Sequence, residues 1–142
     1  MTDKKNDNSL CALLLGAFEK DRPLLTEIFR RAGWRLLEAR NRRRALHCLQ
    51  KNPVQVVIAE SDLPDWNWKH VLNDLRRMAA PPQLVVTSAT ADEYLWAEVL
   101  NVGGYDVLAQ PLEADEVERV VVSAWRHFPK SPTPVEPLYN VA

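Results

Sequence analysis

Polar side chains that could bind or react with a ligand follow several short apolar runs in this sequence. Glu60 comes directly after one run, Ser88 ends another, and Gln110 follows a third, whereas the first run leads into Gly16 and Ala17. If these runs are strands of an open parallel sheet, their carboxyl ends meet at one edge, where such sheets bind ligands. The edge offers a carboxylate, a hydroxyl and an amide. Gly16 and Ala17 add no side-chain oxygen that could hold a hard cation such as Mg²⁺.

Five short segments are expected to be the strands that position these residues. Four of them are mostly free of charge and rich in Val, Leu and Ile, which is typical of strands buried on both faces of a parallel sheet. They cover residues 10–15, 54–59, 84–88 and 105–109, and a fifth candidate strand covers residues 34–38.

Segments with helical spacing alternate with the strands. Pro23 and Gly33 mark the start and end of the first helix, Asn41 can cap the second, and Pro81 follows the third. Thr90 and Glu93 have the spacing of a capping box before the fourth helix, and the fifth runs from about Glu113 to His127. A strand followed by a helix, five times over with short connections, predicts a doubly wound α/β fold with five helices.

Length and composition fit one soluble domain. The chain has 142 residues, 46% of them hydrophobic and 26% charged, and its formal charge is −1. No apolar run is long enough to span a membrane and the start does not look like a secretory signal, so we expect a cytoplasmic protein without a membrane partner. Cys11 and Cys48 are expected to be buried thiols. The domain is expected to cover residues 10–128, between a polar tail, 1–9, and a proline-rich tail, 129–142.

Over about residues 10–128 the sequence resembles the receiver domain of two-component response regulators. The resemblance depends on the strand and acid of residues 56–60 with Pro64 four residues later, on residues 102–106 with their two glycines, and on Gln110-Pro111. It implies a flavodoxin-like sheet with strand order 2-1-3-4-5 and a role in bacterial phosphorelay signal transduction. It also implies a cis bond between Gln110 and Pro111.

Carried over residue by residue, the resemblance implies a degenerate site. Receivers take a phosphoryl group on an aspartate after the third strand, bind Mg²⁺ with two acids after the first, and contact the phosphoryl group with a Ser/Thr and a Lys. In this sequence Glu60 stands at the acceptor position and Gly16 and Ala17 stand at the positions of the two acids. Ser88 stands at the Ser/Thr position and Gln110 at the Lys position. Only Ser88 keeps its family type. We therefore expect no metal, no cofactor, no catalytic residue and no enzyme activity.

Two acidic residues leave alternatives open. Glu60 is either an inert substitution or a carboxylate that stands where a phosphoryl oxygen would and mimics the activated state. Asp62 is either a substitute acceptor or a turn residue. The family's switch aromatic corresponds to Val107, which has no large second rotamer, so the usual switch is expected to be absent.

Arginine and tryptophan are the other unusual features. Seven arginines lie between residues 30 and 44: Arg30, Arg31, Arg35, Arg40, Arg42, Arg43 and Arg44. They form either a solvated face or a surface for nucleic acid or an acidic partner. Trp66 and Trp68 are expected in a polar loop, as contact residues or packed over the emptied pocket, whereas Trp34, Trp96 and Trp125 are expected in or near the core.

These observations predict an atypical receiver domain, a pseudo-receiver, that acts by protein–protein interaction and is not phosphorylated by the usual Asp/Mg mechanism. Its partner is a signalling protein or a second copy. We expect contacts at the fourth helix, fifth strand and fifth helix, with Tyr94, Tyr105 and Arg119 as candidates. One alternative is a receiver still phosphorylated on Glu60 or Asp62, and another is binding through the arginines, although nucleic acid is disfavoured. A nucleotide or flavin is disfavoured because no Gly-rich loop follows the first strand.

Overall fold

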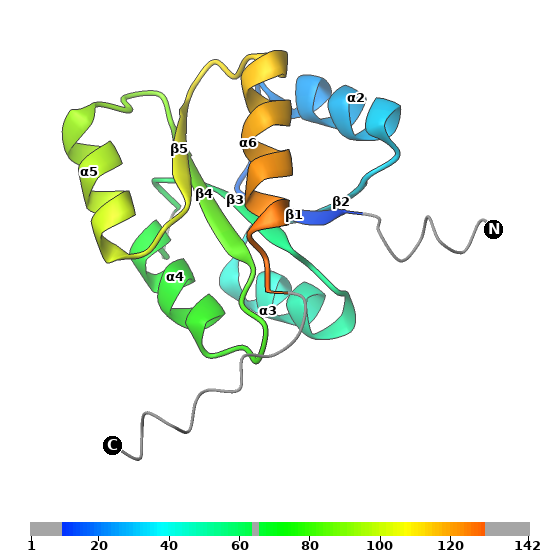
Figure 1. Ribbon diagram of the computed structural model, residues 1–142, viewed down its shortest axis with the longest axis vertical. Coiled ribbons are helices and arrows are strands. Elements are labelled where there is room, and N and C mark those ends of the chain that lie inside the picture. Colours follow the sequence, from blue (N-terminus) through cyan, green and yellow to red (C-terminus); the bar gives the residue numbers. More distant parts are fainter. Residues whose placement is uncertain (1–9, 64–65, 130–142) are drawn as a thin grey trace.

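A parallel five-stranded sheet forms the centre of the protein, which is described by a computed structural model for residues 10–63 and 66–129 (Figure 1). The sheet has the order β2-β1-β3-β4-β5. The strands are β1 (Cys11–Leu15), β2 (Arg35–Ala39), β3 (Val56–Glu60), β4 (Gln83–Ser88) and β5 (Asp106–Ala109). The strand order and fold class expected from the sequence are confirmed.

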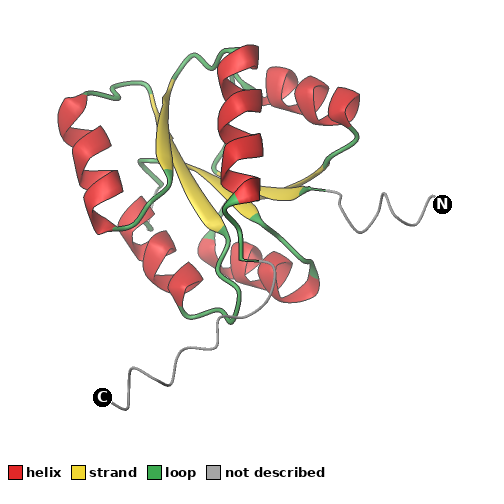
Figure 2. Ribbon diagram, viewed as in Figure 1, coloured by secondary structure: helices red, strands yellow, loops and turns green. Residues whose placement is uncertain are grey.

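In the described part of the chain, five helices cover the two faces of the sheet (Figure 2). They are α2 (Arg22–Ala32), α3 (Arg42–Lys51), α4 (Trp68–Arg76), α5 (Glu93–Val102) and α6 (Ala114–Arg126). Alternate strand residues point to opposite faces. Leu14 and Ile58 pack with α2 and α6 in one core cluster, while Leu13 and Val57 pack with α3 and α4 in the other. The doubly wound arrangement follows from these two apolar faces.

Most helix ends lie where the sequence signals placed them. Asn41 caps α3, with its side-chain oxygen accepting a hydrogen bond from the Arg44 amide at 2.9 Å. Gly33 ends α2 with φ of 76°. The capping box of Thr90 and Glu93 is wrong, because Asp92 is the cap of α5 and accepts from the Leu95 amide at 2.9 Å. Asp92 lies directly before the first helical residue, so its carboxylate reaches the third amide of the helix.

The structure decides between the two alternatives for Trp66 and Trp68. They are 6% and 5% exposed and belong to the core cluster beneath α3 and α4, so they are packed residues and the alternative of exposed contact residues is wrong. Asn67 explains this, because it caps α4 and so makes Trp68 the first residue of the helix, on its apolar face. Trp96 was expected in the core but is 52% exposed on α5.

None of the helices in the described part of the chain is long and apolar enough to span a membrane.

The two cysteines differ in how far solvent can reach them. Cys11 on β1 is 4% exposed, Cys48 on α3 is half-buried, and both are free thiols. Burial raises the pKa of the Cys11 thiol, so its thiolate, which is the reactive form, is scarcer at neutral pH.

We therefore expect iodoacetamide to alkylate Cys48 in the native protein and Cys11 only after unfolding, with peptide mass mapping as the readout. The variant Cys48→Ser is the control, since it should remain unmodified until denaturant is added. Equal labelling rates for the two thiols in the native protein would contradict this packing of β1.

Candidate functional site

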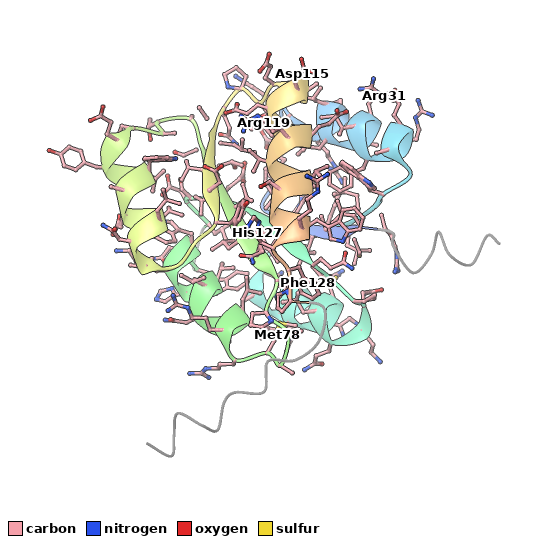
Figure 3. All side chains as sticks on the ribbon, viewed as in Figure 1. Arg31, Met78, Asp115, Arg119, His127 and Phe128 are labelled. Atoms are coloured by element: carbon pink, nitrogen blue, oxygen red, sulfur yellow. The ribbon has the colours of Figure 1, made fainter. Side chains whose placement is uncertain are left out.

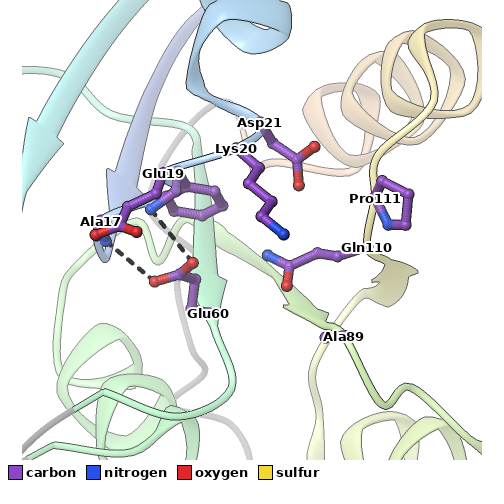
Figure 4. Close-up of a pocket in the computed structure, with 9 residues that line it drawn as sticks. Ala17, Glu19, Lys20, Asp21, Glu60, Ala89, Gln110 and Pro111 are labelled. Carbon is purple, nitrogen blue, oxygen red and sulfur yellow. Dashed lines mark hydrogen bonds between the residues drawn. The ribbon is translucent and has the colours of Figure 1, made fainter.

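A pocket of about 450 Å³ lies at the carboxyl edge of the sheet, where the ends of β1, β3, β4 and β5 come together (Figure 4). The loop between β1 and α2 forms one wall, and the segment after β5 forms the other. The lining residues are Ala17, Phe18, Glu19, Lys20, Asp21, Glu60, Ala89, Gln110 and Pro111. The sequence pattern thus placed Ala17, Glu60 and Gln110 correctly at one site.

The carboxylate of Glu60 is bound by backbone amides. Glu60 ends β3, and its side chain turns toward the loop after β1, where Oε1 accepts a hydrogen bond from the Ala17 amide at 3.0 Å and Oε2 accepts from the Phe18 amide at 3.3 Å (Figure 4). Two successive amides aimed at one anion form the kind of concavity that proteins use to bind anionic groups. Here the anion belongs to the protein itself.

Gly16 is the residue that makes room for this contact. Its φ is 128°, and a Cβ atom built at this position would lie 2.8 Å from Cδ and 2.9 Å from Cγ of Glu60. Any L-residue here would therefore meet both an unfavourable backbone conformation and the glutamate side chain. In the sequence, Gly16 is noticed only because receivers have an acidic residue at this position. The structure shows that Gly16 also leaves the space that the Glu60 side chain, longer than aspartate, occupies.

The loop after β1 keeps its shape through two buried residues. Phe18 has a positive φ of 48° and is 2% exposed, packed in the core cluster with α2 and α6. Asp21 is 7% exposed, and its Oδ1 accepts a hydrogen bond from the Leu112 amide at 3.1 Å. This bond joins the two walls of the pocket. Sequence reasoning missed it because the partners are 91 positions apart.

The other polar residues of the edge bond among themselves. Ser88 Oγ accepts from the Thr90 amide at 3.1 Å, and Gln110 Nε2 donates to Thr87 Oγ1 at 3.3 Å. In the described part of the chain, no hydrogen bond joins Glu60 to Ser88 or Gln110. The Lys20 side chain points toward Gln110 (Figure 4). The Gln110–Pro111 bond is cis, as expected from the sequence.

These residues do not fit a Mg²⁺ ion. The cation prefers several carboxylates and water, but Gly16 and Ala17, directly after β1, carry no side-chain oxygen, and Glu60 is already bound to two amides. The Asp21 carboxylate already accepts a hydrogen bond from the Leu112 amide, and Glu19 is exposed. In residues 10–63 and 66–129, no three His, Cys, Asp or Glu side chains gather as a metal cluster.

The remaining candidate residues lie outside this pocket. Asp62 is exposed and does not line it. Val107, the switch-equivalent residue, is 9% exposed on β5. The Tyr105 hydroxyl is hydrogen-bonded with the Ser123 hydroxyl and, at 3.1 Å, with His127 Nδ1. Pro64 lies outside the described residues.

A second hollow lies beside β5, between α5 and α6. It measures about 340 Å³, and its lining includes Asp92, Glu93, Trp96, Val107, Ala109 and Glu116. Tyr94, nearby on α5, is 86% exposed, and Arg119 is exposed on α6 (Figure 3). The structure brings Trp96 and Val107 together here, a pairing that the sequence did not indicate.

The match between Gly16 and Glu60 can be tested by a double-mutant cycle. We expect Gly16→Ala to lower the free energy of unfolding by about 1–3 kcal/mol, because it adds both backbone strain and a clash. In a Glu60→Ala background the clash is absent, so the same substitution should cost less. Urea unfolding of the four proteins measures both values. Equal costs in the two backgrounds would show that Glu60 does not occupy this space.

Comparison with known proteins gives one family. The sequence model described as "Response regulator receiver domain" matches residues 19–122. None of the curated proteins compared with the chain matches it.

Solved structures share the fold. The receiver domain of the Francisella response regulator 1452 is 20% identical with a TM-score of 0.72, covering 83% of this chain and 98% of its own. A putative response regulator from Chloroflexus aurantiacus J-10-fl is 20% identical with a TM-score of 0.74, covering 84% and 99%. The receiver domain of Ssk1 from Saccharomyces cerevisiae, solved with the histidine phosphotransfer signalling protein Ypd1, is 14% identical with a TM-score of 0.72, covering 83% and 90%. Because the family match spans most of the chain and the fold agrees, this protein belongs to the response regulator receiver domain family of two-component signalling.

Proposed function

We propose that this protein is a pseudo-receiver, which acts in signal transduction by binding a protein partner and is not phosphorylated by the usual Asp/Mg mechanism. The observation that carries the proposal is the placement of the Glu60 carboxylate against the Ala17 and Phe18 amides, in space that Gly16 leaves open.

Phosphoryl transfer depends on positioning and on neutralising the charge of the phosphoryl oxygens, much of which a bridging metal supplies. The carboxylate that would be the nucleophile is instead an acceptor for two amides, and both are hydrogen bonds to a charged group, which are stronger than neutral ones. Gln110 provides an amide where the family has a cation, and that amide donates to Thr87. Nucleophile, metal ligands and counter-charge are therefore all changed.

Glu60 takes over a structural task in this proposal. A metal between the ends of β1 and β3 would tie the two strands together, and here the glutamate does so directly through the loop amides. Mimicry of the activated state through Ser88 is not favoured, because Ser88 bonds to Thr90 rather than to Glu60. We infer that the pocket stays in one arrangement and that signalling depends on the outer surface.

The surface best suited to a partner is the face made by α5, β5 and α6. Among the described residues, the exposed large hydrophobic side chains are all on α5: Tyr94, Trp96, Leu100 and Val102. Val99 is the one residue of α5 that is fully buried, so this helix buries little of its apolar surface. Clustered aromatic and aliphatic groups beside a hollow are typical of a protein-binding site.

The charge of this face indicates a cationic partner. The acidic residues of α5, β5 and α6 are Glu93, Glu98, Asp106, Asp115, Glu116 and Glu118, and the basic residues are Arg119 and Arg126. Asp92 and Glu93 face Glu116 across the hollow. A symmetric dimer through this hollow would bring two mainly acidic surfaces together, so a second protein with basic residues fits better than a second copy. The structure of the yeast receiver with a phosphotransfer protein supports partner binding by this fold.

One observation favours the alternative of a receiver that can still be phosphorylated. Lys20 points into the pocket toward Gln110, so a positive charge approaches the site from the α2 side (Figure 4). This cation does not replace the missing metal ligands, and Asp62 is too exposed to share the pocket. We therefore rank this alternative second.

Acetyl phosphate with Mg²⁺ should leave the protein unmodified, because neither the metal nor the nucleophile has its usual site. Intact-mass spectrometry is the measurement. The triple variant Ala17→Asp, Glu60→Asp, Gln110→Lys should gain one phosphoryl group, whereas the control Ala17→Asp, Gln110→Lys, which keeps Glu60, should not. Modification of the wild-type protein that is lost on Glu60→Gln, Asp62→Asn or Lys20→Ala would overturn the proposal.

Sedimentation at varied ionic strength tests the choice between a second copy and another partner. We expect a monomer at low salt, because the acidic rim repels itself, and any self-association should strengthen as salt screens that repulsion. Trp96→Ala should remove the salt-promoted association, while Trp125→Ala serves as the control, because Trp125 on α6 packs against the core cluster with α2 and does not line the hollow. A dimer that is tightest at low salt would instead show paired opposite charges across this face.

A further inference from the structure

The seven arginines between residues 30 and 44 do not form one uniform surface. Arg30 and Arg31 on α2 both pair with Glu27, and the Arg30 contact is 2.8 Å. Arg42 makes a two-pronged contact with Asp74 at 2.9 and 3.2 Å. Arg35 donates to Asn52 at 2.8 Å. Within the described part of the chain, salt bridges account for three arginines and the Asn52 contact accounts for Arg35, which leaves Arg40, Arg43 and Arg44 without a side-chain partner.

Two of these three arginines line a separate pocket. It measures about 370 Å³, lies at the carboxyl end of β2, and is lined by Glu38, Ala39, Arg40, Asn41 and Arg44. Glu38 is the only acid in the lining, and Arg22 already binds it with two guanidinium nitrogens. The charge of Glu38 is thus balanced from outside the pocket, and the guanidinium groups of Arg40 and Arg44 remain uncompensated.

This concentration of positive charge opposes the stability of the domain. Arg42, Arg43 and Arg44 occupy the first turn of α3, and no acidic residue lies in that turn. Cations at this end of a helix are unfavourable, and like charges one turn apart repel each other. Asp74 compensates the positive charge of Arg42 but not that of Arg43 or Arg44. A bound anion in the pocket would relieve the remaining two side chains that line it.

We propose that this pocket binds the phosphate group of a small phosphorylated ligand, such as an oligophosphate. Arginine matches phosphate because its planar fork donates two parallel hydrogen bonds to two oxygens. The lining favours a compact anion over a peptide, since Ala39 is its only apolar residue and offers little surface for a side chain. The site is distinct from the Glu60 pocket, and the proposal does not depend on the pseudo-receiver function.

Titration calorimetry with pyrophosphate at low ionic strength tests the proposal. We expect saturable binding that weakens roughly tenfold or more in the double variant Arg40→Ala, Arg44→Ala, because two charge-assisted contacts are lost. The matched control is Arg30→Ala, Arg31→Ala, which removes the same charge from the same stretch of sequence but from side chains already paired with Glu27. The control should change the affinity about twofold or less. Absence of saturable binding, or equal losses in the two variants, would overturn the proposal.

Two further measurements keep the test decisive. Amide chemical shifts of the wild-type protein should move at residues 38–44 on adding pyrophosphate, which needs no variant to fold. Chemical shift changes that extend equally over α2 would show that pyrophosphate does not bind in this pocket. A short DNA duplex is the second probe. If it binds far more tightly than pyrophosphate and both double variants weaken it equally, the arginines act as one extended nucleic-acid surface and the pocket proposal is wrong.

Discussion

The hydrogen bonds from two successive amides to the Glu60 carboxylate are the contact on which the site depends. They fix the loop after β1, and that loop forms one wall of the pocket at the carboxyl edge of the sheet. The contact requires a glycine at position 16, and it uses the carboxylate that the family would present to a phosphoryl group. Under the pseudo-receiver proposal, this side chain, one methylene longer than aspartate, acts with the changes at Gly16, Ala17 and Gln110 to make the pocket self-bound.

The central strands β1, β3 and β4 are buried on both faces, yet the helices cover the sheet unequally. Helices α2, α4 and α6 each bury three or more side chains, whereas α5 fully buries only Val99. Exposed apolar area costs free energy in water, and the proposed partner would cover that of α5. The proposed loss of phosphorylation chemistry and the proposed binding face are compatible, because the two features lie on different elements.

Charge is divided between the two ends of the domain. The face of α5, β5 and α6 is mainly acidic, while the first turn of α3 and the end of β2 carry uncompensated arginines. The near-zero formal charge of −1 conceals this division. The two regions would attract opposite classes of ligand, a cationic protein at one and a compact phosphate anion at the other. They can be tested independently, since substitutions in one leave the other intact.

The sequence alone determined the doubly wound fold and most helix ends, because apolar periodicity and capping residues such as Gly33 and Asn41 act over a few neighbouring positions. The strand order came from the resemblance to receiver domains. The sequence also brought Ala17, Glu60 and Gln110 to one edge, since the ends of parallel strands must meet there. Tertiary structure decided that Trp68 is buried and Trp96 exposed, because burial depends on which helix face meets the sheet. It also decided what Glu60 binds. That contact joins residues more than 40 positions apart and depends on a loop conformation that no local pattern specifies.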